Sequence, residues 1–372
     1  MYQPRIGDEL AVLDTPSLLV DLDLMEHNIA LLQERLHRSH VQLRPHLKTA
    51  KCPEIAQILL AAGAIGGCVS KVSEAEVMAQ AGIEDLLITS EVVGQPKINR
   101  LVQLVEQHPQ IKVVVDSLDG AAALDQAFQL VQKPLDILIE IDVGQHRCGI
   151  EPGEVAVSFA QQLRQFRCLR LRGIQGYQGH VQLIADSDER ERMCRQSMRA
   201  LTSTVRLLRE AGFPLEIVTT GGTGTVELCA SYPEVTEVQP GSFLFIDAHY
   251  RRVLGPVYTP ALTVVSTILS RPAPYRAIID AGLKSLSIES GMAEPKDRDG
   301  LYYQPFGDEH GLLEWTQEVA ARGMEQVLKV GDRLELIPSH CDTTINLFDT
   351  YYAHRKGKIE AIWSIAARGK VQ

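Results

Sequence analysis

The chain has 372 residues, of which 45% are hydrophobic and 23% are charged, and its formal net charge is −10 at pH 7. This length favours one large domain and one smaller domain over a single core. The acidic balance, without a dense run of Lys and Arg, argues against a nucleic-acid-binding surface. No stretch approaches the roughly 20 apolar residues of a membrane span.

The cysteines are the second compositional signal. Seven of them are scattered along the chain without any Cys-x-x-Cys pair. That pattern is typical of reduced thiols rather than of a disulfide framework or a structural zinc site. Residues 1–9 lack the apolar core of a secretory signal. The sequence therefore predicts an untargeted cytoplasmic protein.

The first two thirds of the chain alternate between strand-like and helix-like segments. The predicted strands are 41–47, 66–70, 86–90, 112–116, 135–143, 169–177, 216–220 and 235–239. The predicted helices between them include 54–62, 71–81, 96–107, 118–131, 154–166 and 187–211. This alternation requires a parallel sheet covered by helices. Eight strands in succession predict a (β/α)₈ TIM-like barrel, with an open doubly wound sheet as the alternative.

The pattern changes after Asp247, where prolines become frequent and helical patterns largely disappear. The segments 261–269, 275–280, 332–337 and 358–365 resemble antiparallel strands. We therefore expect a barrel over residues 15–249 and a second, mostly antiparallel β domain over residues 250–372, joined by residues 1–14.

Active sites of such barrels lie at the C-terminal ends of the strands. Polar residues that follow predicted strands include Lys48, Arg147, Tyr177 and His180. Lys48 could form a Schiff base if nearby cations, among them Arg44, His46 and Lys51, lowered its pKa. The alternative is an ordinary solvated lysine.

Two glycine-containing segments follow the seventh and eighth predicted strands, where barrels often bind phosphate. The candidate phosphate-binding residues are Thr220, Gly222, Thr223, Gly241 and Ser242. Glycines allow close approach of the backbone, and hydroxyls supply donors. The alternative is a flexible loop with turn glycines.

A candidate metal site lies near the end of the chain. His340 and Asp342 are spaced i, i+2, so in an extended segment both side chains project from one face and Cys341 from the other. One imidazole and one carboxylate suit Mn²⁺, Mg²⁺ or Co²⁺ at least as well as Zn²⁺. The open coordination positions are what a catalytic metal needs. The alternative is a loop histidine beside a capping aspartate.

Five ordered motifs resemble those of the D-threonine aldolases. These aldolases belong with the D-serine dehydratases among the alanine-racemase-like (fold type III) pyridoxal-phosphate enzymes. The motifs occupy residues 45–49, 142–149, 221–225, 239–242 and 338–342. The resemblance implies a barrel with a β domain, usually in a homodimer. It also implies pyridoxal 5'-phosphate and a divalent metal, for which Mn²⁺ is the first candidate and Mg²⁺, Co²⁺ or Zn²⁺ are alternatives.

The resemblance also implies roles for the cofactor residues. Lys48 matches the lysine that binds pyridoxal phosphate covalently. Arg147 matches an arginine near the pyridoxal ring oxygen, and Tyr177 matches a tyrosine close to the cofactor. The two glycine loops match the phosphate site.

The metal and base positions distinguish the branches of the family. His340 and Asp342 match the metal ligands of the aldolases, whereas the dehydratases usually carry a cysteine where Asp342 stands. The aldolases also carry a histidine, proposed as the base, six residues after the tyrosine, and here that position is Leu183. His180 is therefore the candidate base.

The resemblance implies retro-aldol cleavage of D-3-hydroxy amino acids, such as D-threonine to glycine and acetaldehyde. A metal-dependent dehydratase acting on D-serine or D-3-hydroxyaspartate is the first alternative. A metal-independent amino-acid racemase is the second. A non-catalytic carrier of pyridoxal phosphate would not need the second domain. The sequence leaves open the physiological substrate, the metal and the oligomeric state.

Overall fold

The computed structural model describes residues 4–316, 318 and 328–372. Contacts divide the chain into two compact units. The β unit comprises Met1–Ile29 and Ser242–Arg368, and the barrel unit comprises Ala30–Gly241 and Gly369–Gln372. This division differs from the predicted boundaries of 15–249 and 250–372.

The barrel unit is built on a sheet of 8 parallel strands in the order β2-β9-β8-β7-β6-β5-β4-β3. A parallel bridge between His46 and Cys68 joins the two ends of this order, and the N–H of Leu47 donates to the carbonyl of Cys68 at 2.8 Å. The sheet closes into a ring, which confirms the predicted (β/α)₈ barrel. The strands are β2 (Gln42–Leu43), β3 (Gly67–Val69), β4 (Leu86–Ile88), β5 (Lys112–Val115), β6 (Leu135–Glu140), β7 (Leu169–Gly176), β8 (Ile217–Thr220) and β9 (Glu237–Val238).

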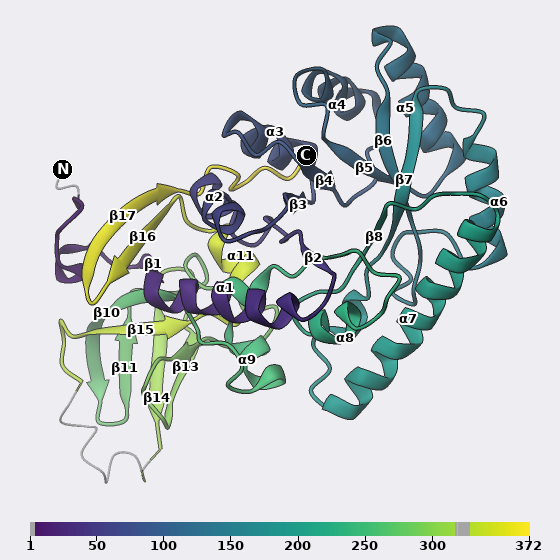
Figure 1. Cartoon of the computed structure of the whole chain (residues 1–372). Coiled ribbons are helices and arrows are strands. Elements are labelled where there is room, and N and C mark those ends of the chain that lie inside the picture. The colour runs from purple at the N-terminus through teal and green to yellow at the C-terminus, as the bar shows by residue number, and fades with distance from the viewer. Residues whose placement is uncertain (1–3, 317, 319–327) are drawn as a thin grey trace. The chain divides into compact units, whose positions relative to one another are not determined.

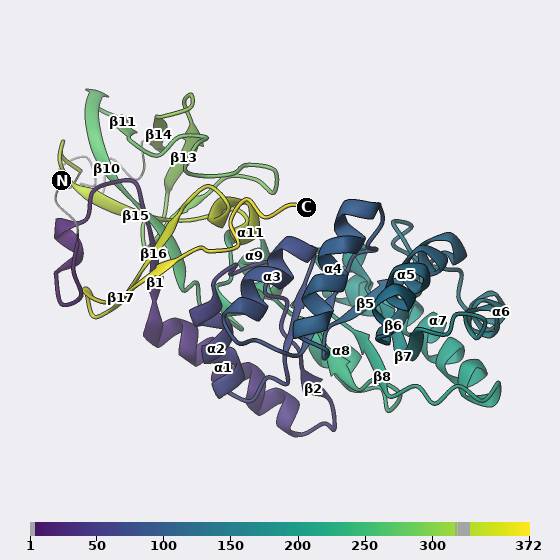
Figure 2. The ribbon, with the colours of Figure 1, turned by 90° about the horizontal axis from the view of Figure 1, so that it is seen from above.

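Helices alternate with these strands and lie outside them (Figure 1). Seen from above, α3, α4, α5 and α6 follow one another around the strands in chain order (Figure 2). Ser117 caps α5 by accepting from the N–H of Gly120, and Asp186 caps α7 by accepting from that of Glu189. The helices are α1 (Leu22–His37), which belongs to this unit from Ala30 onward, α2 (Pro53–Ala61), α3 (Val72–Gln80), α4 (Gln95–Gln107), α5 (Leu118–Val131), α6 (Glu154–Leu163), α7 (Ser187–Glu210) and α8 (Val226–Ala230).

The β unit contains a sheet of 9 strands in the order β13-β14-β11-β10-β1-β16-β17, with β15 pairing β10 and β12. Its strand pairs are antiparallel except for β1 with β16. The strands are β1 (Ser17–Asp21), β10 (Leu262–Ala273), β11 (Arg276–Ile279), β12 (Glu294–Pro295), β13 (Leu301–Pro305), β14 (Gly311–Trp315), β15 (Arg333–Ile337), β16 (Thr350–Arg355) and β17 (Lys358–Ser364). Two short helices, α9 (Ala248–Leu254) and α11 (Cys341–Ile345), complete the unit as described here.

Strand β1 explains why the domain boundary differs from the prediction. Its first four residues are buried, so it needs a partner on each edge. In the register Leu18 pairs with Val264 of β10 on one side and with Tyr351 of β16 on the other. Leu19 packs in one apolar cluster with Val265 and others. Residues 15–29 therefore belong with the β unit.

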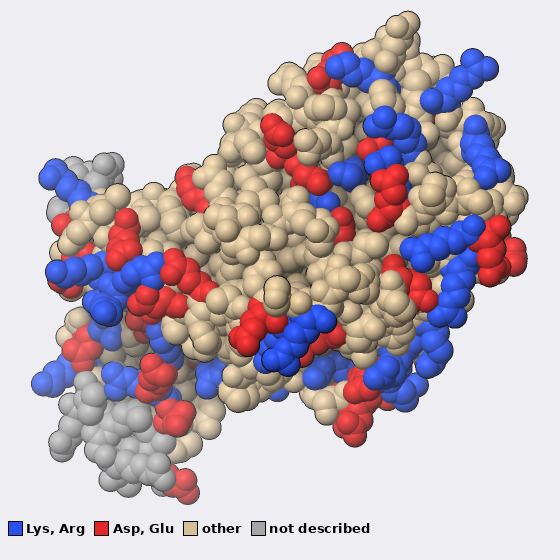
Figure 3. All heavy atoms as spheres, in the orientation of Figure 1, with Lys and Arg blue, Asp and Glu red and all other residues tan. Residues whose placement is uncertain are grey.

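Acidic and basic side chains are interspersed over the face seen in Figure 3. None of the helices in the described part of the chain combines the length and apolar character needed to cross a membrane.

Candidate active site

The loops that follow the barrel strands meet at one edge, because parallel strands all end there. The structure places the predicted residues Lys48, Arg147, Tyr177, His180 and Gly241 in the loops after β2, β6, β7 and β9.

Lys48 lies in a turn that follows the bridge between His46 and Cys68. Its backbone N–H donates to Nδ1 of His46 at 3.4 Å, and Nε2 of His46 lies 3.0 Å from Oγ1 of Thr89. Burial, and then the charges of Lys48 and Arg147, lower the pKa of His46 well below its ordinary value. His46 is therefore a neutral imidazole that fixes the turn, and the Lys48 side chain is half-buried beside it.

Two of the cations that we expected to act on Lys48 form ion pairs with carboxylates instead. The guanidinium of Arg44 lies 2.8 Å from Glu237 and 2.7 Å from Asp85. The amine of Lys51 lies 2.6 Å from Glu74. Glu237 begins β9 and Asp85 precedes β4, so Arg44 joins strands at the amino-terminal end of the barrel. These pairs correct the expectation drawn from sequence neighbours.

Arg147 is carried by a loop after β6 whose shape Asp142 determines. Oδ1 of Asp142 accepts from the N–H groups of Gly144 at 2.9 Å and His146 at 3.0 Å. Both residues have positive φ, 111° and 54°, so the chain turns sharply before Arg147. The guanidinium carbon of Arg147 lies 5.9 Å from the centroid of the Tyr177 ring. The structure thus brings these two predicted residues together.

His180 lies in the short 3₁₀ turn Gly179–Val181 after β7. Its Nδ1 is buried and has no hydrogen-bond partner among the described residues. Burial lowers the pKa of His180, the charge of Asp142 opposes this effect, and His146 adds to it. The imidazole is therefore neutral at pH 7. A neutral histidine with an unpartnered ring nitrogen can take up a proton, as a general base must.

Two glutamines that follow β7, Gln178 and Gln182, hold the loop between β8 and α8. Oε1 of Gln178 accepts from the N–H of Gly221 at 3.3 Å, and Oε1 of Gln182 accepts from that of Gly224 at 2.9 Å. A Cβ on Gly222 would lie 2.6 Å from the same oxygen of Gln182. Packing against Gln182 is therefore one reason for glycine here. Nothing in the spacing of the glutamines indicated this role.

The predicted phosphate-binding residues differ in what they contact. The hydroxyl of Thr220 is buried and donates to the carbonyl of Gly176 at 2.7 Å, so it links β8 to β7. A Cβ on Gly241 would lie 2.7 Å from Oγ1 of Thr49, in the turn next to Lys48. That hydroxyl is buried, and none of the residues that the structure describes forms a hydrogen bond with it. An unpaired donor beside a glycine fits an anionic oxygen such as that of a phosphate group. The remaining predicted donors, Thr223 and Ser242, are buried.

A buried polar chain links neighbouring strands of the barrel. Nε2 of Gln175 donates to Glu140 at 2.5 Å. Nε2 of Gln239 donates to Gln175 at 2.7 Å and to Thr219 at 2.8 Å. Burial raises the pKa of Glu140 well above its ordinary value, although Gln175 opposes this effect. Glu140 is the last residue of β6, and this position at the end of a strand was its only signal in the sequence.

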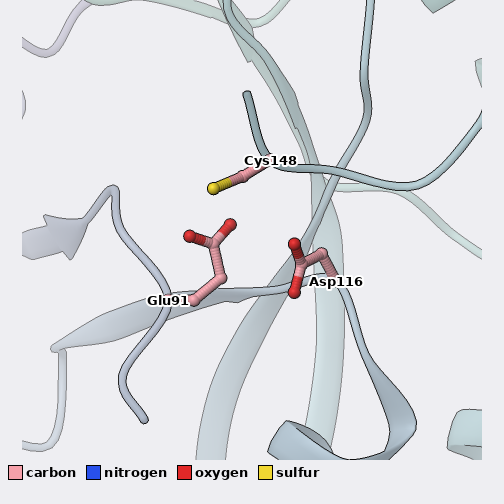
Figure 4. Close-up of side chains that lie close together, drawn as sticks. All are labelled: Glu91, Asp116 and Cys148. Atoms are coloured by element: carbon pink, nitrogen blue, oxygen red, sulfur yellow. The ribbon is translucent and has the colours of Figure 1, made fainter. Parts of the chain in front are cut away.

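Glu91, Asp116 and Cys148 form a further group whose ligand-capable atoms lie within 4.8 Å of one another. In Figure 4 the carboxylate of Glu91 and the thiol of Cys148 point toward each other. Burial and the charge of Glu91 raise the pKa of Cys148 to about 11. Asp116 accepts from the N–H of Gly149 at 3.1 Å. These contacts anchor the end of the loop that carries Arg147.

In the β unit, His340 and Asp342 lie with two further carboxylates. Nδ1 of His340 lies 2.5 Å from Glu289, and Nε2 lies 3.8 Å from Oδ1 of Asp342. Asp247 accepts from the N–H of Cys341 at 3.0 Å, and burial raises its pKa to about 6. Burial lowers the pKa of His340, but the three carboxylates together raise it above the ordinary value.

We expected His340 and Asp342 to lie in one extended segment, but the structure shows that they do not. Strand β15 ends at Ile337, and α11 begins at Cys341. His340 occupies the N-cap with extended backbone, φ −143° and ψ 126°. Asp342 lies in the first helical turn, where the helix dipole favours a carboxylate. The two side chains still face each other because the chain bends between them.

The His340–Asp342 pair fits a divalent metal ion. Oδ1 of Asp342 is buried, and no described residue forms a hydrogen bond with it. Its separation of 3.8 Å from Nε2 of His340 is too long for a hydrogen bond. This imidazole nitrogen and this carboxylate oxygen could together hold a divalent ion. The mixed nitrogen and oxygen donors suit Mn²⁺, Mg²⁺, Co²⁺ or Zn²⁺.

Comparison with known proteins covers both units. Residues 20–249 match the family model of the alanine racemase N-terminal domain, and residues 261–354 match a putative serine dehydratase domain. A D-threonine aldolase from Arthrobacter sp is 42% identical over 98% of this chain and 95% of its own. A 3-hydroxy-D-aspartate aldolase from Paracoccus denitrificans (strain Pd 1222) is 34% identical over 98% and 94%. The crystal structure of D-threonine aldolase from Filomicrobium marinum has a TM-score of 0.94 and 38% identity, with 99% of each chain covered.

The fold and these similarities identify the chain as an alanine-racemase-like enzyme from a family of pyridoxal-phosphate-dependent lyases. The chain belongs to the family that unites the D-threonine aldolases with the D-serine dehydratases, which confirms the resemblance seen in the five motifs.

Proposed function

We propose that this protein is a pyridoxal-phosphate- and divalent-metal-dependent lyase that cleaves D-3-hydroxy amino acids, converting D-threonine to glycine and acetaldehyde. The observation that carries the proposal is similarity along almost the whole chain to proteins named aldolases. A carboxylate at Asp342 beside His340, where the dehydratases usually carry a cysteine, supports the same branch of the family.

The barrel unit would hold the cofactor. Lys48 would bind pyridoxal phosphate covalently through Nζ, with Arg147 and Tyr177 at its ring. The predicted residues Thr220, Gly222, Thr223 and Gly241, together with Thr49, would lie near its phosphate. When bound, the cofactor supplies a sink for the electron pair of the broken bond. The half-buried turn of Lys48 and the unpaired hydroxyl of Thr49 support this assignment.

The β unit would hold the metal. His340 and Asp342 are the proposed ligands, with Mn²⁺ first and Mg²⁺, Co²⁺ or Zn²⁺ as alternatives. The ion would supply Lewis acidity toward the β-hydroxyl of the substrate. The unpaired, buried oxygen of Asp342 supports this assignment.

His180 is the proposed base. It would take the proton of the β-hydroxyl as the Cα–Cβ bond breaks and the aldehyde carbonyl forms. The electron pair of that bond stays with Cα, which then takes a proton from Lys48 or Tyr177 to give glycine. The lowered pKa of His180 keeps the imidazole neutral and able to accept the proton. Leu183, at the position of the histidine in the aldolases, cannot do so.

A dehydratase is the second candidate, because residues 261–354 match a putative serine dehydratase domain. In that reaction Lys48 would take the proton of Cα and the β-hydroxyl would leave, with release of ammonia. D-Serine and D-3-hydroxyaspartate would be the substrates. A racemase would need no metal.

Incubation of the purified protein with D-threonine, pyridoxal phosphate and Mn²⁺ separates these functions. We expect glycine and acetaldehyde in equal amounts, and we expect EDTA to abolish both. A dehydratase would release 2-oxobutyrate and ammonia, and a racemase, which inverts only Cα, would form L-allo-threonine in the presence of EDTA. Either of these outcomes without acetaldehyde would overturn the proposal.

We also propose that the protein is a cytoplasmic homodimer. The family resemblance supports the dimer, which light scattering of the purified protein would test. All seven cysteines are free, which suits a reducing compartment.

A further inference from the structure

We propose that Glu289 is a positioning residue of the metal site: it holds His340 in the tautomer and ring orientation that leave Nε2 free to bind the ion. The inference rests on the proposed function only in taking His340 and Asp342 as the ligands.

The two ring nitrogens of His340 have different partners. Nδ1 lies 2.5 Å from Oε1 of Glu289, while Nε2 faces Oδ1 of Asp342 at 3.8 Å. A carboxylate can only accept a hydrogen bond, so Nδ1 must carry the proton. In the neutral ring the lone pair then lies on Nε2, on the side of Asp342. Nε2 is therefore the atom that would bind the metal.

Glu289 is itself held by hydroxyl groups. Oγ1 of Thr343 donates to its Oε1 at 2.9 Å, and Oγ of Ser287 donates to its Oε2 at 2.7 Å. Oγ of Ser339 donates to the backbone carbonyl of Ser287 at 2.8 Å. The loop at residues 287–289 is thus bound to the segment that carries His340 on both sides of this histidine. Such contacts fix the carboxylate where Nδ1 needs an acceptor.

This arrangement matters because only two protein ligands are proposed. With so few ligands, rotation of the imidazole away from Asp342 would remove much of the affinity for the ion. Carboxylates that accept from the second nitrogen of a metal-binding histidine typically strengthen metal binding about 10–100-fold. The side chain of Glu289 is 45% exposed, so its replacement leaves no buried charge without a partner and should leave the fold intact.

Titration with Mn²⁺, followed by the electron paramagnetic resonance signal of the free ion, tests the inference on the purified full-length protein. Glu289→Ala should bind Mn²⁺ about 10–100-fold more weakly than wild type. Glu289→Gln keeps an acceptor for Nδ1 and should lose less. The matched control is Glu360→Gln, whose side chain lies in the same unit and is 48% exposed; it should bind as wild type does. His340→Ala should show no specific binding.

Two further measurements separate a positioning role from a structural one. The unfolding temperature of Glu289→Ala without metal should equal that of wild type. Its acetaldehyde production should need more Mn²⁺ for half-maximal activity yet approach the wild-type rate at saturating Mn²⁺.

The outcomes distinguish the inference from the function on which it rests. If His340→Ala binds Mn²⁺ as wild type does, the proposed metal site is wrong. If His340→Ala loses binding while Glu289→Ala keeps the wild-type affinity, the role of Glu289 is overturned and the proposed function stands.

Discussion

Arg44→Met should destabilise the barrel unit strongly without removing any group that acts at Lys48. The Arg44 side chain is 2% exposed and pairs with Glu237, which is 6% exposed. Loss of the guanidinium would leave Glu237 as a buried carboxylate without a partner, at a cost of about 3–5 kcal/mol. For a unit of this size each kcal/mol lowers the Tm by about 2–4 °C, so the expected decrease is about 6–20 °C.

Thermal unfolding followed by circular dichroism at pH 7 would measure this decrease. The double variant Arg44→Met/Glu237→Leu removes both charges and should recover most of the stability, because buried ion pairs can often be replaced by apolar side chains. Asp85 keeps a partner in that variant, since Lys112 lies 2.8 Å from it. A decrease below about 2 °C in Arg44→Met, or no recovery in the double variant, would refute the reasoning.

The second ion pair of Arg44, with Asp85, predicts a pH dependence. Burial opposes ionisation of Asp85, but Arg44 and Lys112 hold its pKa below the ordinary value. A lowered folded-state pKa adds stability above the unfolded-state pKa, and this stability is lost as the pH falls through the folded value. The difference in unfolding free energy between wild type and Arg44→Met should therefore be largest near neutral pH and shrink below about pH 4.

Two substitutions at the rim probe the proposed chemistry. His180→Ala should lower kcat for acetaldehyde release about 10²–10⁴-fold, which is the usual loss when a general base is removed. The control His108→Ala, at the end of α4, should leave kcat unchanged. Equal kcat values in the two variants would exclude His180 as the base. Gln182→Ala removes the acceptor for the N–H of Gly224 and should weaken pyridoxal-phosphate binding about fivefold, since a lost hydrogen bond costs roughly 1 kcal/mol and a tenfold change is about 1.4 kcal/mol. Fluorescence titration of the apoprotein measures this affinity, with the exposed Gln162→Ala as control, and wild-type affinity in Gln182→Ala would contradict the bracing role.

The barrel was predictable from the sequence because its signal is repeated. Each predicted strand segment in 41–239 contains one of the strands β2 to β9, and helical patterns that could cover the strands separate most of them. The sequence did not indicate to which sheet β1 belongs, because a short apolar run looks the same in a barrel and in a mixed sheet. Its partners, β10 and β16, lie hundreds of residues away along the chain.

The sequence could indicate a candidate site residue only where that residue follows a strand or belongs to a motif. Lys48, Arg147, Tyr177 and His180 met that condition. Gln182 and Glu289 did not, because their roles depend on contacts 42 and 51 residues away along the chain. Arg44 shows the opposite error: adjacency to Lys48 suggested a shared role, but its partners are carboxylates on other strands.

The most direct test of the central claim is to reduce the holoenzyme with borohydride and map the pyridoxyl group by peptide mass spectrometry. The account predicts one modified peptide, with the label on Lys48, and no label in Lys48→Ala, which should also release no acetaldehyde from D-threonine. A label on another lysine of the wild-type protein, or acetaldehyde release by Lys48→Ala at the wild-type rate, would contradict it.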